Sequence, residues 1–97
     1  GISLAIPEGL VGLNFARSGM AAKRGLAPAN KVGVIDADYR GEVCVILVNL
    51  SNEPFTITDG ERIAQMVVSK HETVEWQLVE TLNQTQRGEG GFGHTGK

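Results

Sequence analysis

The sequence has one cysteine, no large excess of charge of either sign and no long apolar run, and each of these shortages excludes a class of protein. A single cysteine, Cys44, cannot form a disulfide within the chain. No apolar run approaches the ~20 residues of a membrane span, and no basic-then-apolar leader is visible. Nine basic against eleven acidic residues argue against a general binder of nucleic acid or of membrane surfaces. We therefore expect an intracellular, cytoplasmic protein that has neither nucleic acid nor membrane as a partner.

The length of 97 residues indicates one small domain with a thin margin of stability, so we expect oligomerisation to help it. Cys44 lies within the apolar run Val43–Val48, which predicts a small buried residue rather than a nucleophile or metal ligand. Because this run is apolar on both faces of the pleat, we also expect a strand buried on both sides, as at the centre of an oligomer.

Short β-type stretches, each closed by turn residues, recur along the chain and predict an all-β sandwich or barrel. Only Ser18–Arg24 looks helical, for one or two turns that end at Gly25. The polar, uncharged segment Thr81–Gln86 is typical of a linker. The predicted strands are Ile2–Ile6, Leu10–Phe15, Lys31–Ile35, Glu42–Leu50, Phe55–Thr58, Arg62–Ser69 and Thr73–Val79.

Two polar clusters could contact a ligand. In the first, Arg17, Ser18 and Gly19 precede the short helical turn, where a guanidinium and unpaired N–H groups suit a phosphate. The same residues also fit an ordinary helix start, in which Ser18 caps the helix and Arg17 is solvated. In the other, β alternation gives Gln65 apolar neighbours, so its amide needs a partner from the backbone or from a ligand.

A third cluster, "GVIDADYRGE", combines three carboxylates and an arginine between two predicted strands. A polar turn explains this composition. However, Asp36 directly follows apolar residues that would hold its carboxylate at the rim of a pocket, where it could act as a base. Tyr39, the single tyrosine, could serve there as a flat platform against a ring. The residues alone leave both interpretations open.

The fourth cluster is the end of the chain, "RGEGGFGHTGK", with five glycines and one aromatic residue, Phe92. Glycine-rich ends lose much entropy on ordering, so a frayed terminus is the simplest interpretation. Alternatively, the segment is a flap over an anion, because closely spaced glycines let backbone N–H groups approach phosphate oxygens. Arg87 and Lys97 would add charge to such a flap. Composition does not decide between the two.

In this order and spacing, the four clusters resemble motifs two to five of the trimeric dUTP pyrophosphatases (dUTPases). The matching stretches are "ARSGMAAKRGL", "NKVGVIDADYRGEV", "GERIAQMVV" and "RGEGGFGHTGK". The resemblance implies an all-β, jelly-roll-like barrel or sandwich subunit with one short helical turn, and a homotrimer with active sites shared at its interfaces. It implies hydrolysis of dUTP to dUMP and pyrophosphate by base-assisted attack of water on the α-phosphate. Mg²⁺ is then expected on the triphosphate, without dedicated ligands from the protein.

Position within the motifs assigns a role to individual residues. Asp36 matches the general base, and Tyr39 matches the aromatic residue beneath the deoxyribose, which would exclude a ribose 2′-hydroxyl. The family's uracil-binding elements are matched by Asn30 and by the hairpin backbone at Val32, Gly33 and Ile35. The residues that match the family's phosphate contacts are Arg17, Ser18, Gly19 and Gln65. Of these, we expect Arg17 and Gln65 to act in catalysis with Asp36.

In the tail, Arg87 matches the γ-phosphate contact and Phe92 the ring that stacks on uracil. The segment that closes on the nucleotide matches Gly91, Gly93, His94, Thr95 and Gly96. We therefore expect residues 1–80 to form the β core and residues 81–97 to form a linker and glycine-rich lid. At ~3.3 Å per residue, the chain after Val79 could extend about 60 Å and reach a neighbouring subunit. We predict that this tail is disordered without nucleotide and ordered with it.

Three positions depart from the family pattern. Ala16 stands where proline is common, and His94 replaces a frequent serine. Nothing matches the first motif, which supplies an aspartate near the metal and should lie upstream of Gly1. The subunit is then a fragment incomplete at its N-terminus, or is completed by another polypeptide, or is a reduced member. This departure motivates an alternative function, a dUTPase-like nucleotide-binding sensor or regulator with little turnover. A purely structural β-trimer module is a further alternative.

Overall fold

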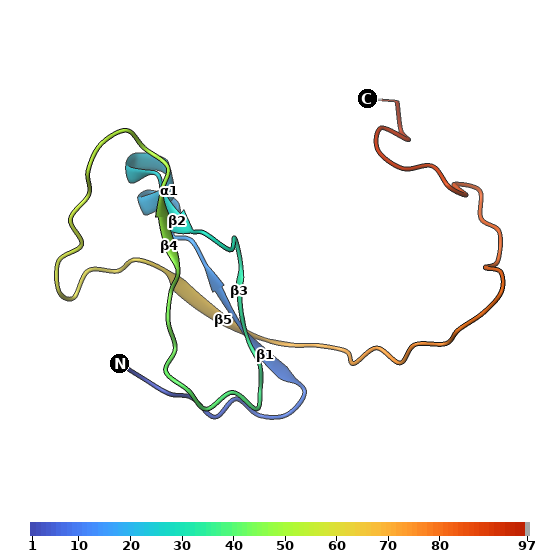
Figure 1. Ribbon diagram of the computed structural model, residues 1–97, viewed down its shortest axis with the longest axis horizontal. Coiled ribbons are helices and arrows are strands. Elements are labelled where there is room, and N and C mark those ends of the chain that lie inside the picture. The colour runs from blue at the N-terminus through green and yellow to red at the C-terminus, as the bar shows by residue number, and fades with distance from the viewer. Residues whose placement is uncertain (97) are drawn as a thin grey trace.

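The architecture, described by a computed structural model for residues 1–96, is mostly β with one short helix (Figure 1). Antiparallel pairing forms a three-stranded sheet in the order β3-β1-β5 and a two-stranded sheet of β2 and β4. The predicted β class with a single helical turn is confirmed, although the described residues close no barrel. In chain order the elements are β1 (Leu10–Phe15), α1 (Ser18–Arg24), β2 (Leu26–Pro28), β3 (Gly33–Ile35), β4 (Leu47–Asn49) and β5 (Gln65–Lys70).

Strand β1 is the centre of the larger sheet. It pairs with β5 along its whole length, from Leu10 opposite Lys70 to Phe15 opposite Gln65, and with β3 over three residues. Close packing here requires a glycine, because a Cβ on Gly12 would lie only 3.0 Å from the Ile6 Cδ1 atom. The predicted bounds of this strand and of α1 are confirmed.

Helix α1 has a defined cap at its C-terminal end but no side-chain cap at its N-terminal end. Gly25, in the left-handed region with a φ of 66°, ends the helix and donates its N–H to the Ala21 carbonyl. The last turn carries Lys23 and Arg24, whose charge suits that end of the helix dipole. At the start, the N-cap is Arg17 and no side chain caps the helix. The interpretation of Ser18 as a capping residue is therefore wrong, because Ser18 is already the first helical residue.

Several predicted strands are shorter than expected or absent. The stretch Ile2–Ile6 forms only one bridge, from Ser3 to Glu42, and Phe55–Thr58 and Thr73–Val79 form no strand. A β-type sequence becomes a strand only where a partner supplies a run of hydrogen bonds, and within the described residues these segments find at most an isolated bridge. Conversely, β2 was missed because it is only three residues long and ends in a proline.

The core of the chain is small. The buried apolar side chains are Ile6, Leu26 and Ile35, and none of the described side chains is completely buried. The radius of gyration is 19.0 Å, against ~13 Å for a compact domain of this length. Figure 1 shows why: after β5 the chain runs away from the sheets as an open arc. No helix in the described part of the chain has the length and apolar character needed to span a membrane.

Apolar surface is left uncovered as a result. Trp76 and Leu78, in the arc, are 90% and 101% exposed, and Ile46 is 61% exposed. Within the single chain Val43–Val48 is not buried on both faces, and Cys44, predicted to be buried, has an exposed side chain. Burial of this segment at the centre of an oligomer stays a prediction. The alternate residues Cys44 and Ile46 are exposed, and within residues 1–96 the strand of this segment, β4, pairs with β2 alone.

Candidate functional site

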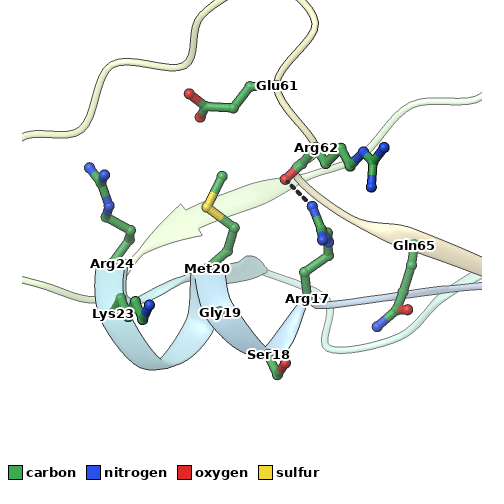
Figure 2. A pocket seen from close by; sticks show the side chains of 9 residues that line it. All are labelled: Arg17, Ser18, Gly19, Met20, Lys23, Arg24, Glu61, Arg62 and Gln65. Atoms are coloured by element: carbon green, nitrogen blue, oxygen red, sulfur yellow. Dashed lines mark hydrogen bonds between the residues drawn. The ribbon is translucent and has the colours of Figure 1, made fainter.

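A basic groove lies between α1 and the segment that leads into β5 (Figure 2). Its volume is about 470 Å³, and it brings together two of the predicted clusters that are more than forty residues apart in sequence. The side chains of Arg17, Met20 and Arg24 point from the helix toward the segment that carries Glu61, whereas that of Ser18 points away from it. The lining residues are Arg17, Ser18, Gly19, Met20, Lys23, Arg24, Glu61, Arg62 and Gln65.

Two hydrogen bonds hold the two sides of the basic groove together. The Nη1 atom of Arg17 donates to the Arg62 carbonyl over 3.3 Å, and the Nε2 atom of Gln65 donates to the Ala16 carbonyl over 2.8 Å. The predicted need of Gln65 for a partner is thus met by the backbone. A guanidinium carries five N–H donors, so one bond leaves most of those on Arg17 available to an anion.

The groove contains charged residues that the sequence analysis did not assign. Lys23, Arg24 and Arg62 add three cations, and Glu61 adds one carboxylate. The Glu61 carboxylate accepts a hydrogen bond from the Thr58 hydroxyl over 3.1 Å through Oε1, while Oε2 is covered and has no partner in the described chain. The one signal in the sequence for these charged residues was that they lie within the matched stretches. The sequence pattern does not distinguish charged residues that line a groove from charged residues that face solvent.

A second hollow, the hairpin pocket, lies beside β3 and has a volume of about 240 Å³. It gathers five of the predicted residues, whereas Val32, which is 38% exposed, is not among its lining residues. Four lining residues were not predicted as site residues, and they are Asn14, Val34, Cys44 and Ile46. The full lining is Asn14, Asn30, Gly33, Val34, Ile35, Asp36, Tyr39, Cys44 and Ile46.

The turn after β3 holds its aromatic residue in a fixed place. The Tyr39 hydroxyl donates to the Glu42 carbonyl over 2.8 Å, and its N–H donates to the Asp36 carbonyl over 3.1 Å. The Nη1 atom of Arg40 closes the same turn by donating to the Ala37 carbonyl over 2.6 Å. The Tyr39 ring, 46% exposed, lies so close to Gly41 that a Cβ there would overlap it. Asp36 is exposed at the rim of the hairpin pocket, as predicted.

The tail residues form a third group that is separate from the other two (Figure 1). Turns fold it locally, with the Arg87 Nε atom donating to the Gly90 carbonyl over 2.6 Å and the His94 N–H donating to the Gly91 carbonyl over 2.9 Å. The Phe92 side chain is fully exposed. Lys97 lies outside the described residues. The residues that line the hollow of this tail are Arg87, Gly91, Phe92, Gly93, His94 and Thr95.

No metal cluster supplements these three groups. Residues 1–96 contain no set of three or more His, Cys, Asp or Glu side chains placed to hold a metal ion. The cations of the basic groove suit phosphate groups, and a pocket with a few polar groups such as the hairpin pocket suits a small ligand.

Comparison with known proteins gives the family. The family model for dUTPase matches residues 1–96, so the chain belongs to the dUTPase family. The deoxyuridine 5'-triphosphate nucleotidohydrolase of Rickettsia bellii is 55% identical over 96 residues, which are 99% of this chain and 64% of that protein. The enzyme of the same name from Fusobacterium nucleatum is 54% identical over 97 residues, which are 66% of its length. The chain thus spans slightly less than two thirds of these relatives.

Solved structures agree with this assignment. The dUTPase of Staphylococcus bacteriophage 80alpha with dUPNHPP superposes with a TM-score of 0.80 at 30% identity, covering 95% of this chain and 70% of that one. A mutant of the same phage enzyme gives a TM-score of 0.78 at 32% identity, with the same coverage. The jelly-roll-like character expected of the β fold is therefore confirmed, and a divalent metal cofactor is consistent with the family.

The contact between Tyr39 and Gly41 yields a direct test of the turn. Gly41→Ala should move the Tyr39 ring, because the added Cβ overlaps it, at a cost of about 1–3 kcal/mol in unfolding free energy. Since Tyr39 is the single tyrosine, its ring resonances in an NMR spectrum report its position. Gly91→Ala is the control, because its Cβ would meet nothing within 4 Å. Unchanged Tyr39 resonances in Gly41→Ala would contradict the packing described here.

Proposed function

We propose that this protein hydrolyses dUTP to dUMP and pyrophosphate. The observation that carries the proposal is the hairpin pocket, in which a carboxylate (Asp36), an aromatic ring (Tyr39) and an amide (Asn30) line one hollow. The chain belongs to the dUTPase family and is similar to proteins named deoxyuridine 5'-triphosphate nucleotidohydrolase, and both findings support the choice of substrate. The phage dUTPase described with dUPNHPP supports a nucleotide ligand.

In this proposal Asp36 is the general base. Its exposed carboxylate, at the pocket rim, accepts a proton from a water molecule as that water attacks the α-phosphorus. The bond between the α-phosphorus and the bridging oxygen breaks, and pyrophosphate leaves with the bonding electrons. Tyr39 lies beneath the deoxyribose and rejects a ribose 2′-hydroxyl by contact. Its hydrogen bond to the Glu42 carbonyl keeps the ring in place for this task.

The phosphates occupy the basic groove. Arg17 and Gln65 act in catalysis there by gathering and orienting the triphosphate, with Ser18 and Gly19 contributing contacts. We propose that the divalent cofactor is Mg²⁺ and that the triphosphate itself carries it into the groove, since Mg²⁺ is commonly bound through substrate phosphates with few protein ligands. When bound, the ion neutralises charge that develops on the phosphate oxygens.

Asn30 and the backbone of Val32, Gly33 and Ile35 read the uracil edge, so that cytosine would leave polar groups unpaired. Residues 1–80 serve as the β core and residues 81–97 as linker and lid. In the lid, Arg87 contacts the γ-phosphate and Phe92 stacks on the base, while the remaining segment closes over the nucleotide. This closing segment is made of Gly91, Gly93, His94 and Thr95.

Replacement of the proposed general base, Asp36→Asn, tests the reaction. It should lower kcat for dUTP by at least about 100-fold, because general-base catalysis contributes 10²–10⁴-fold, while dUTP still binds. Asp59→Asn, the same change in an exposed turn, is the control and should keep wild-type turnover. The measurement is pyrophosphate release with Mg²⁺ from dUTP, dCTP, dTTP and UTP. Turnover that survives Asp36→Asn, or equal activity on dCTP, would reject the proposal, whereas dUTP binding without any turnover would favour the sensor or regulator.

Removal of residues 87–97 tests the lid. The truncated protein should lose at least about tenfold in kcat/KM for dUTP, since stacking of one base on an aromatic ring contributes roughly 1–3 kcal/mol. Phe92→Ala should show most of this loss and Phe92→Tyr little of it. Hydrogen exchange of the tail amides should slow when a non-hydrolysable dUTP analogue is added. The lid assignment fails if truncation leaves turnover unchanged or if the exchange rates do not respond to the analogue.

We further propose a homotrimer whose active sites are shared between subunits. The exposed apolar side chains of Ile46, Trp76 and Leu78 support association, because a neighbouring chain would remove them from water. The distance of the tail from both pockets supports sites built from more than one chain (Figure 1). Sedimentation equilibrium should give the mass of three chains. A fully active species with the mass of one chain would contradict the proposal.

A further inference from the structure

The hairpin pocket contains a polar side chain that the matched motifs and the proposed mechanism do not use. Asn14, the next-to-last residue of the central strand β1, is only 6% exposed, and it is the sole buried polar residue among the residues described. Its carboxamide takes part in none of the side-chain hydrogen bonds within residues 1–96. A largely buried polar side chain without a partner inside the chain is unusual, so its place on this strand requires an explanation.

The amide of Asn14 opens into the pocket rather than being sealed in the core. Asn14 is one of the residues that line the hairpin pocket. In the described chain, the one fully covered side-chain polar atom that lacks a partner belongs to Glu61, so the amide atoms of Asn14 remain accessible. An accessible amide on an otherwise buried side chain can form hydrogen bonds to a ligand inside the pocket.

Strand pairing places this amide beside a second one. Asn14 is directly opposite Gly33 in the pairing of β1 with β3. A Cβ on Gly33 would lie 3.5 Å from the Asn14 Nδ2 atom and 3.7 Å from the Asn30 Nδ2 atom. The two carboxamides therefore border the space that the missing side chain of Gly33 leaves open. Both asparagine and glycine are unfavourable in strands, so this arrangement is not what sheet stability alone would select.

We infer that Asn14 is a second residue that reads the base, acting with Asn30 on the polar edge of the uracil ring. This inference rests on the proposed function. A carboxamide offers both a donor and an acceptor, which suits a ring edge that carries carbonyl oxygens and an N–H group. The pocket, at about 240 Å³, is smaller than the ~300–1,000 Å³ of most ligand sites. It suits a base and its sugar, with the phosphates outside.

Replacement of Asn14 by valine separates binding from folding. Asn14→Val should weaken dUMP binding about tenfold in calorimetry, because a polar atom of the base is left without a partner. The kcat/KM for dUTP should fall to a similar extent, mainly through KM. The Tm without ligand should stay unchanged or rise, since valine is a good strand former and the buried amide is removed. Binding of inorganic pyrophosphate in the basic groove should not change.

Two further variants make the test decisive. Asn83→Val, which removes a carboxamide from the exposed linker, is the matched control and should bind dUMP normally. Asn14→Leu, whose side chain has the same number of heavy atoms and the same branching as asparagine, replaces Asn14→Val if that variant does not fold. Unchanged dUMP affinity in either folded Asn14 variant would overturn the inference while leaving the proposed function intact. A wild-type protein that neither binds dUMP nor hydrolyses dUTP would instead overturn the proposed function, and this inference with it.

Discussion

The pairing of β1 with strands on both sides is the constraint on which the rest of the structure depends. On one side, β5 places Gln65 opposite Phe15, so that the Gln65 amide reaches the Ala16 carbonyl and the basic groove forms around Arg17. On the other side, β3 places Gly33 opposite Asn14 and so opens the hairpin pocket. One strand thus positions both halves of the candidate site, the cations that we propose bind the phosphates and the amides that we propose bind the base.

The same small sheet leaves the chain dependent on association. Among residues 1–96 the core contains three buried apolar side chains, which contribute little hydrophobic free energy, and the arc after β5 leaves Trp76 and Leu78 exposed. Under the proposed trimer, association would serve both stability and function, because the exposed side chain of Ile46 also lines the hairpin pocket. The exposed tail follows the same logic, because its residues form a hollow of their own, away from both pockets.

Features governed by local chemistry were predictable from the sequence. The bounds of Leu10–Phe15 follow from apolar alternation, and those of Ser18–Arg24 follow from a helix that must end at Gly25. The exposed position of Asp36 at the rim of a pocket also followed from the residues around it. By contrast, Cys44 was assigned to the core from its apolar neighbours, and its exposure depends on which element covers that face.

The sequence by itself determined the β class, the short helix and the family, because periodicity, glycine positions and motif order are properties of consecutive residues. Only the tertiary structure decided that Arg24 and Arg62 border one groove and that Asn14 borders the hairpin pocket. The sequence alone does not explain an asparagine in an apolar strand, because it does not show which residue lies opposite in the sheet. Opposite Gly33 it becomes a buried amide with open space before it, and that placement is a property of strand register rather than of the strand itself.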